Sequence, residues 1–167
     1  MADITGTSDH DALDGTTSAD TIDGGSGNDT INAGAGNDTV TGGLDKDTIN
    51  LGAGDDIYKL SKVDLVDNSD FYGNWQYSQI KDIVDGGAGT DTIQIVDQQV
   101  NYDLTRAQLS NVEKLLAANS YRSKIALTAE QIAQFSEIDT SYYGNNPPHR
   151  WRCRFVLAHS GRIYLRI

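Results

Sequence analysis

A large apolar residue recurs every nine residues in the first part of the chain, flanked on each side by a mostly polar residue. This column consists of Leu13, Ile22, Ile31, Val40, Ile49 and Tyr58, and it returns at Ile93. In Thr30-Ile31-Asn32, for example, one apolar side chain stands between two polar ones. Because successive side chains of a strand point to opposite faces, each such triplet predicts a short strand with one inward-facing residue.

The column belongs to a repeated unit of nine residues. Cut from Gly6, residues 6–59 read GTSDHDALD, GTTSADTID, GGSGNDTIN, AGAGNDTVT, GGLDKDTIN and LGAGDDIYK, without an insertion. A further unit, GGAGTDTIQ, occupies residues 86–94, and residues 81–85 look like the back half of another. A fixed short period predicts a solenoid.

Two other features of the unit point to a cation. Glycine dominates positions one, two and four of the better units, where it permits tight turns and close approach of backbone carbonyls. Position six is always aspartate, as Asp11, Asp20, Asp29, Asp38, Asp47, Asp56 and Asp91. Carboxylate and carbonyl oxygens are the ligands that suit Ca²⁺.

A stack of such units needs more than its apolar column to fold. Burying one aliphatic side chain contributes roughly 1.5–3 kcal/mol, whereas ordering nine backbone residues costs roughly 9–18 kcal/mol. Stacked carboxylates also repel one another, and a divalent cation between them reverses that effect. We therefore expect a chain that is largely disordered without Ca²⁺ and folded with it.

The unit resembles the repeat of the RTX (hemolysin-type) family, whose consensus is G-G-x-G-x-D-x-U-x, with U large and apolar. The resemblance implies an all-β fold, a right-handed parallel β-roll or β-solenoid in which two units form one turn. It also implies several Ca²⁺ ions, each held between a loop and the loop two units on. The Gly6, Gly24 and Gly42 loops would stack on one side, and the Gly15, Ala33 and Leu51 loops on the other.

The resemblance also implies a set of ligands. Carboxylates would come from Asp11, Asp20, Asp29, Asp38, Asp47 and Asp56, and backbone carbonyls from Gly25, Gly27, Gly34, Gly36, Gly43, Gly52 and Gly54. We expect the later unit to restart the stack beside the Leu51 loop, with Gly87, Gly89 and Asp91 as ligands. Asp45, in place of a glycine, either ligates or distorts its loop. The first two units lack two glycines and form weaker sites or an N-terminal cap.

The remaining sequence divides into four further segments after the tandem repeats of residues 1–59. Residues 60–85 form an insertion with an aromatic loop, in which Tyr72, Trp75 and Tyr77 are either a glycan-binding platform or a flap over the roll. Residues 86–94 are the later repeat. Residues 95–138 continue and cap the solenoid with short helical segments, and capping-box patterns begin at Thr105 and Thr128.

Residues 139–167 differ in composition from the rest. They contain five of the arginines and carry net positive charge, although the whole chain has a net charge of −11. Alternation around Phe155 and the turn before Ile163 predict a hairpin. This tail is either a native cap or non-native sequence, such as an out-of-frame or vector-derived end.

Composition narrows the function. The acidic charge argues against a nucleic-acid partner, and no apolar run is long enough to span a membrane. One cysteine excludes an intrachain disulfide, and the first residues do not look like a signal peptide. We find no catalytic motif and expect no enzyme activity.

The function predicted from the sequence is a Ca²⁺-dependent folding and binding module of a secreted or cell-surface bacterial protein, an adhesin or exoprotein. The family resemblance implies type I secretion. The alternatives are a non-catalytic C-terminal module of an exoenzyme, such as a protease, lipase or alginate epimerase, or a carbohydrate-binding module. The expected partners are calcium ions, with glycans or a cell surface as further candidates.

Overall fold

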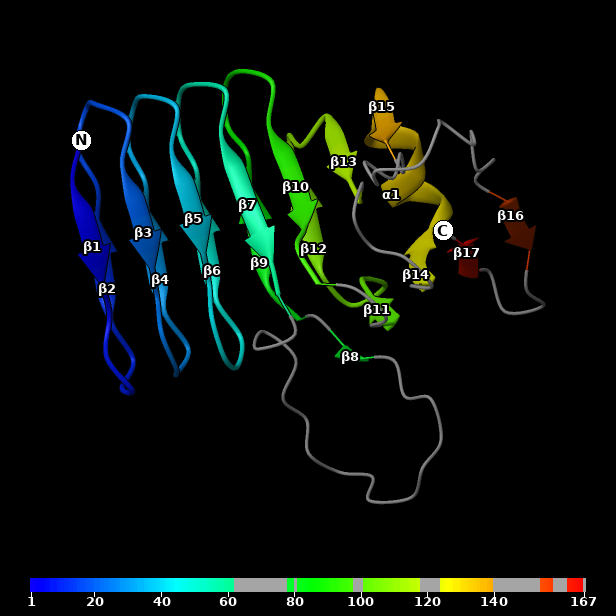
Figure 1. Cartoon of the computed structure of the whole chain (residues 1–167), viewed down its shortest axis with the longest axis horizontal. Coiled ribbons are helices and arrows are strands. Elements are labelled where there is room, and N and C mark those ends of the chain that lie inside the picture. The colour runs from blue at the N-terminus through cyan, green and yellow to red at the C-terminus, as the bar shows by residue number, and fades with distance from the viewer. Residues whose placement is uncertain are drawn as a thin grey trace, which may run out of the picture.

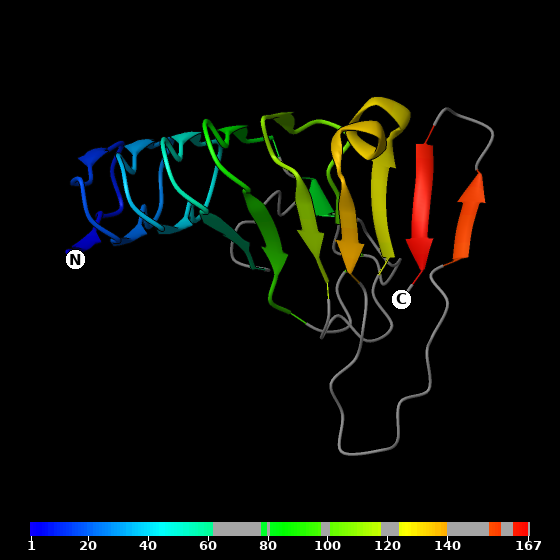
Figure 2. The ribbon, with the colours of Figure 1, turned by 90° about the horizontal axis from the view of Figure 1, so that it is seen from above.

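The repeats form two facing parallel sheets that are joined by loops on both sides (Figures 1 and 2). The computed structural model describes residues 1–61, 78–79, 81–97, 101–117, 124–139, 154–157 and 162–166. Its first strands are β1 (Asp3–Thr5), β2 (Ala12–Asp14), β3 (Thr21–Asp23), β4 (Thr30–Asn32), β5 (Thr39–Thr41), β6 (Thr48–Asn50) and β7 (Ile57–Leu60). From β2 onward, each strand contains the triplet predicted from the apolar column.

Strand pairing sets the turn of this roll at two units. Strand β3 pairs in parallel with β1 and β5, and Ile22 lies opposite Ile4 and Val40. Strand β4 pairs in the same way with β2 and β6 on the other side. Partners are therefore 18 residues apart in sequence, and the prediction of a parallel β-roll is confirmed.

The insertion lengthens one turn without changing the register. The next repeat strands are β9 (Ile83–Asp85) and β10 (Thr92–Ile95). Thr48 pairs with Ile83 and Ile57 pairs with Thr92, so partners are here 35 residues apart. A bridge between Ala53 and Ala88 places the later loop beside the Leu51 loop, as expected. Tyr72, Trp75 and Tyr77 lie outside the described residues.

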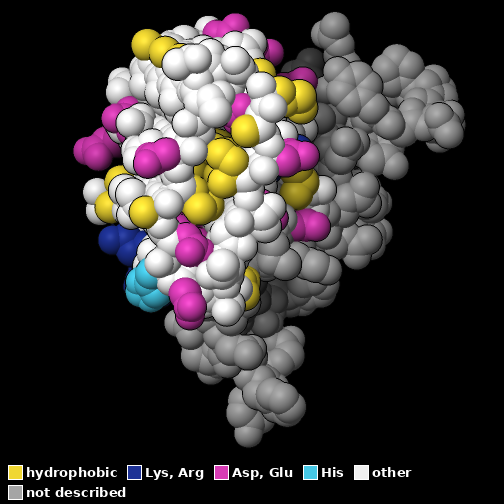
Figure 3. Space-filling model, turned by 90° about the vertical axis from the view of Figure 1, so that its left-hand side faces the viewer, with side chains coloured by type: hydrophobic (Ala, Val, Ile, Leu, Met, Phe, Trp, Pro, Cys, Tyr) yellow, Lys and Arg dark blue, Asp and Glu magenta, His cyan; other side chains and the backbone are white. Residues whose placement is uncertain are grey.

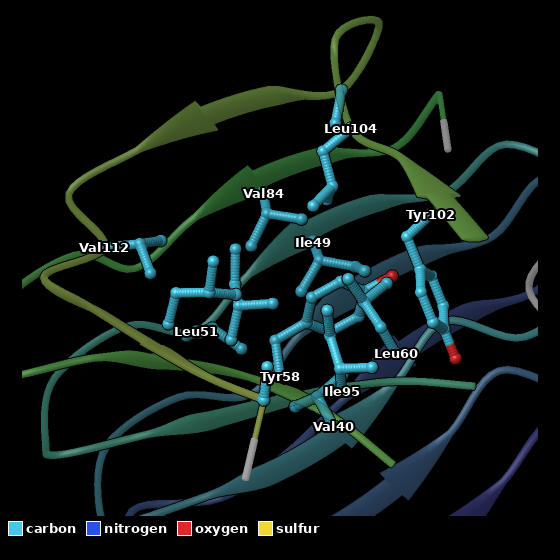
Figure 4. Close-up of a cluster of buried hydrophobic side chains, with 14 of the residues drawn as sticks. Val40, Ile49, Leu51, Tyr58, Leu60, Val84, Ile95, Tyr102, Leu104 and Val112 are labelled. Carbon is cyan, nitrogen blue, oxygen red and sulfur yellow. The ribbon is translucent and has the colours of Figure 1, made fainter. Parts of the chain in front are cut away.

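The core of the roll is a narrow row of side chains between the sheets (Figure 4). Each repeat strand from β3 to β6 buries its middle residue and turns its two neighbours outward. Ala33 and Leu51, at position one of their units, join the row from the loops. Ile31, Val40 and Ile49 are fully buried, as the period-two pattern predicts.

The remaining elements lie in the insertion and after the last repeat. They are β8 (Ser78–Gln79), β11 (Asn101–Asp103), β12 (Gln108–Ser110), β13 (Lys114–Leu116), β14 (Lys124–Thr128), α1 (Ala129–Gln134), β15 (Glu137–Asp139), β16 (Arg154–Leu157) and β17 (Arg162–Arg166). Strands β13 and β15 extend the sheet of β10, β12 extends the sheet of β9, and β8, β11, β14, β17 and β16 form a third sheet.

The two predicted capping boxes have different outcomes. The one at Thr128 is present: its side chain accepts from the Gln131 amide, and the Gln131 side chain accepts from the Thr128 amide. The one at Thr105 is wrong, because residues 105–106 form a turn that leads into β12. There Asp103 accepts hydrogen bonds from the amide and the hydroxyl of Thr105. Stacking of this segment on the preceding turn of the roll overrides the local helix signal.

The predicted C-terminal hairpin is present in the described residues. Strand β16 pairs antiparallel with β17, which pairs antiparallel with β14. Leu165 of β17 is fully buried, so this strand contributes to the core. In the described part of the chain, no helix is long and apolar enough to cross a membrane.

Candidate metal-binding loops

The aspartates at position six lie inside the roll, beneath the glycine loops. Those from Asp20 onward, namely Asp20, Asp29, Asp38, Asp47, Asp56 and Asp91, are buried, and Asp11 is half-buried. From Asp29 onward, one oxygen, Oδ1, accepts the backbone amide of the aspartate one turn earlier. The amide of Asp20 donates to Asp38 at 2.7 Å, and that of Asp38 to Asp56 at 2.7 Å. These bonds fix each carboxylate in a column along the roll.

The other oxygen, Oδ2, has no hydrogen-bond donor at five of these aspartates: Asp29, Asp38, Asp47, Asp56 and Asp91. A buried carboxylate oxygen without a partner is costly, because the charge has lost water and gained nothing in exchange. Burial accordingly raises the pKa of Asp29, Asp38 and Asp56. It raises the pKa of Asp47 to about 7 and that of Asp91 to about 6. Each site therefore requires a proton or a cation.

The loops above these carboxylates can be made only with glycine at certain positions. At position two, Gly25 and Gly43 have φ of +96° and +105°. A Cβ on Gly43 would collide with the carbonyl oxygen of Gly25 in the loop one turn earlier. The positive φ and the close stacking bring backbone carbonyls near the carboxylate column, as a cation with oxygen ligands requires.

The donor set fits a hard cation that takes most of its ligands from the backbone. Within the described residues, no group of three His, Cys, Asp or Glu side chains is placed to hold a metal ion. Carboxylates alone therefore cannot complete a site. Ca²⁺ takes about 6–8 oxygen ligands and accepts backbone carbonyls freely, so the glycine loops would supply the remainder. The individual carbonyl ligands named from the sequence stay a prediction.

The first two loops are built differently from the rest. The amide and hydroxyl of Thr7 donate to Oδ2 of Asp11 at 2.6 and 2.9 Å. The amide and hydroxyl of Thr16 donate to Oδ2 of Asp20, both at 2.7 Å. The Thr16 hydrogen bonds lower the pKa of Asp20. Of the two roles predicted for these units, the contacts favour the cap.

Asp45 keeps its loop in the repeat conformation. Its φ is +82°, the left-handed value that a glycine would adopt at this position. The side chain is exposed, so the predicted distortion of the loop backbone is not seen. Ligation by this side chain stays a prediction.

Two acidic residues of the column were missed as site residues from the sequence. Oδ1 of Asp82 accepts the Asp47 amide at 3.0 Å, and Oε2 of Glu113 accepts the Asp91 amide at 2.9 Å. Asp82 and Glu113 stand two residues before the buried Val84 and Leu115. That spacing, which is the one between positions six and eight of the repeat, was the available signal. Residues 81–85 were recognised as half a unit, but because both units lack the glycine loop, neither Asp82 nor Glu113 was named as a site residue.

Comparison with protein families agrees with this geometry. Residues 5–40, 24–58 and 81–94 match the model of the RTX calcium-binding nonapeptide repeat (4 copies). The chain carries RTX repeats. The matched residues include all five described aspartates whose buried Oδ2 lacks a donor. No match was found among curated proteins or among solved structures.

The RTX loops explain why the roll holds its carboxylates in this way. Calcium, the ion for which these repeats are described, would neutralise the column and occupy the space at Oδ2. In the folded roll, the amide-to-Oδ1 bonds orient the carboxylates from Asp29 onward, and Oδ2 is left for the ion. The RTX roll is thus a structural module.

Proposed function

We propose that the chain is a calcium-dependent folding and binding module of a secreted or cell-surface bacterial RTX protein, of the adhesin or exoprotein kind. The observation that carries the proposal is the set of five buried Oδ2 atoms without a donor. They recur at one position of an RTX repeat, on both sides of the roll.

The thermodynamic argument links these atoms to folding. Without a cation, each buried carboxylate must be protonated or remain unpaired, and both states disfavour the fold near neutral pH. With Ca²⁺, binding free energy adds directly to folding free energy, because the unfolded chain has no preformed loops. A module of this kind folds where calcium is abundant, as it is outside the cell.

The test is a calcium titration of the EDTA-treated protein, followed by far-ultraviolet circular dichroism and by isothermal calorimetry. We expect a cooperative gain of β signal with Ca²⁺ and a much weaker response to Mg²⁺, which demands a smaller octahedral site. A matched pair of variants tests the site. Asp47→Asn should weaken the response, whereas Asp3→Asn, on an exposed strand position, should not. An unchanged β spectrum with and without calcium would contradict the proposal.

A further inference from the structure

Two kinds of loop follow one another along the roll, and they differ in what contacts Oδ2 of the aspartate. In an open loop, such as that of Asp29 or Asp38, Oδ2 is buried and has no donor. In a closed loop, that of Asp11 or Asp20, the same oxygen accepts two hydrogen bonds from one threonine. Asp20 and Asp38 are both buried and lie one turn apart, so burial alone does not explain the difference.

The residue at position two decides which kind of loop forms. Open loops have glycine there with positive φ, as at Gly25 and Gly34. Among described non-glycine residues, only Asp45 and Asn111 have positive φ, so Thr7 and Thr16 do not share this conformation. Their amides point at the carboxylate. Their hydroxyls donate to it as well and accept the amides two residues on, at 3.1 Å in both loops.

A third aspartate whose Oδ2 accepts a hydrogen bond from a hydroxyl lies where the insertion interrupts the repeats. Tyr58 occupies the apolar column and is fully buried. Its hydroxyl crosses the roll and donates to Oδ2 of Asp82 at 2.8 Å. Asp82 has the buried position of a repeat aspartate but no consensus glycine loop before it. A phenol from the opposite sheet thus supplies the donor in a unit without the loop.

We propose that the hydroxyls of Thr7, Thr16 and Tyr58 take the place of calcium, and that ions bind only between two open loops. The inference rests on the proposed function and adds to it which loops are filled. Loops of aspartates one turn apart stack on each other, and both are open in the pairs Asp29–Asp47, Asp38–Asp56 and Asp56–Asp91.

The two closed loops are the first loops of the described roll, and hydrogen bonds from threonine satisfy their carboxylates without an ion. At the N-terminal end of the roll, seen face-on in Figure 3, apolar side chains lie in the middle and acidic ones around them. Ile4 and Leu13 of the first strands are half-buried against the core. A loop that bound an ion here would have no stacked partner before it among residues 1–5. Because the threonine amide and hydroxyl already donate to the carboxylate, these loops need neither an ion nor a stacked partner.

The experiment counts bound Ca²⁺ per chain by equilibrium dialysis with radioactive calcium, on variants that circular dichroism shows to be folded in calcium. Asp20→Asn should leave the count unchanged, because its loop pair is closed. Asp38→Asn should lower the count by one ion, and Asp56→Asn, which belongs to two open pairs, by two. Equal losses for Asp20→Asn and Asp38→Asn would overturn the proposal.

A gain-of-site pair keeps the proposal testable if the asparagine variants do not fold. Thr16→Gly with Ser18→Gly restores both consensus glycines beside Asp20 and should add one ion. Thr16→Ala removes the hydroxyl but keeps a non-glycine residue at position two, and should add none. If the glycine variant binds no additional ion, the inference is wrong, although the proposed function stands. If the wild-type chain binds no calcium, the proposed function fails first.

Discussion

The repeat roll and the C-terminal layer of residues 101–139 achieve a stable interior in different ways. Strands β3 to β6 of the roll each bury one side chain, and the roll also buries a column of carboxylates, five of which have an unpaired oxygen. In the layer, β14 buries Ile125, Ala126 and Leu127 in succession. Its buried Asp103 is paired with Thr105. Among the described residues of the layer, the one buried side-chain atom without a hydrogen-bond partner belongs to a neutral amide, Nε2 of Gln134.

The difference shows where a metal is needed. Apolar area removed from water stabilises the layer in proportion to that area, and Gln131 ties α1 to the carbonyls of Leu104 and Ala107 at 2.7 and 3.1 Å. The roll has too few apolar atoms per residue for this. Its buried carboxylates instead destabilise the folded roll until a cation neutralises them, so the stability of the roll depends on the calcium concentration.

The largest expected effect is that of calcium removal on the two regions. In EDTA, hydrogen exchange followed by mass spectrometry should show loss of amide protection across β3 to β7 by several orders of magnitude. The amides of β14 and α1 should lose much less, because no buried carboxylate oxygen without a partner lies among the described residues of the layer. Equal loss in both regions would show that the two form one cooperative unit.

The next effect is that the stability of the calcium-free roll should fall as the pH rises. Burial raises the pKa of Asp47 to about 7 and of Asp91 to about 6 from the ordinary value of 3.8. The folded state therefore binds protons more tightly than the unfolded state, so stability is greatest below pH 3.8 and falls as the pH rises to about 7. Circular dichroism in EDTA should show more β structure at pH 4 than at pH 8. In saturating calcium this trend should disappear, since the ion requires the deprotonated carboxylates.

Truncation of one buried aliphatic side chain in each region gives a third comparison. Ile49→Ala and Leu127→Ala each remove a fully buried side chain and should cost about 2–5 kcal/mol. Ile49→Ala should raise the calcium concentration at the midpoint of folding, because ion binding and folding of the roll are linked. Leu127→Ala should lower the melting temperature in saturating calcium and shift that midpoint less.

The smallest expected effect is at the helix cap of the layer. Thr128→Ala removes the side chain that accepts the Gln131 amide at 3.1 Å and should cost about 1 kcal/mol. Thermal unfolding in saturating calcium measures this cost. Thr128→Ser keeps the hydroxyl and should retain most of the stability. A similar loss in both variants would assign the effect to packing of the methyl group rather than to the cap.

The repeats could be predicted well because each position of the nine-residue unit has one structural role. The aliphatic position faces inward, the aspartate lies beneath the loop, and the register follows from the period. The function of individual aspartates was harder to predict. Whether Asp20 is open or closed depends on the backbone at Thr16, and the partner of Asp82 is Tyr58, 24 residues away in sequence.

The C-terminal layer was predicted less completely for a related reason. At Thr105 a local helix signal competes with stacking on the preceding turn, and the stack prevails. At Thr128 no such competition arises, and the helix forms. Local patterns decide the outcome only where the neighbouring turn leaves the backbone free.

The most direct test of the account is a crystal structure of the full chain grown with ample calcium, with anomalous diffraction used to locate the ions. We expect ions within about 2.3–2.6 Å of Oδ2 of the open-loop aspartates and of backbone carbonyls from the stacked loops. Density without ions at Asp38, Asp47 and Asp56, or carboxylates turned out into solvent, would contradict it.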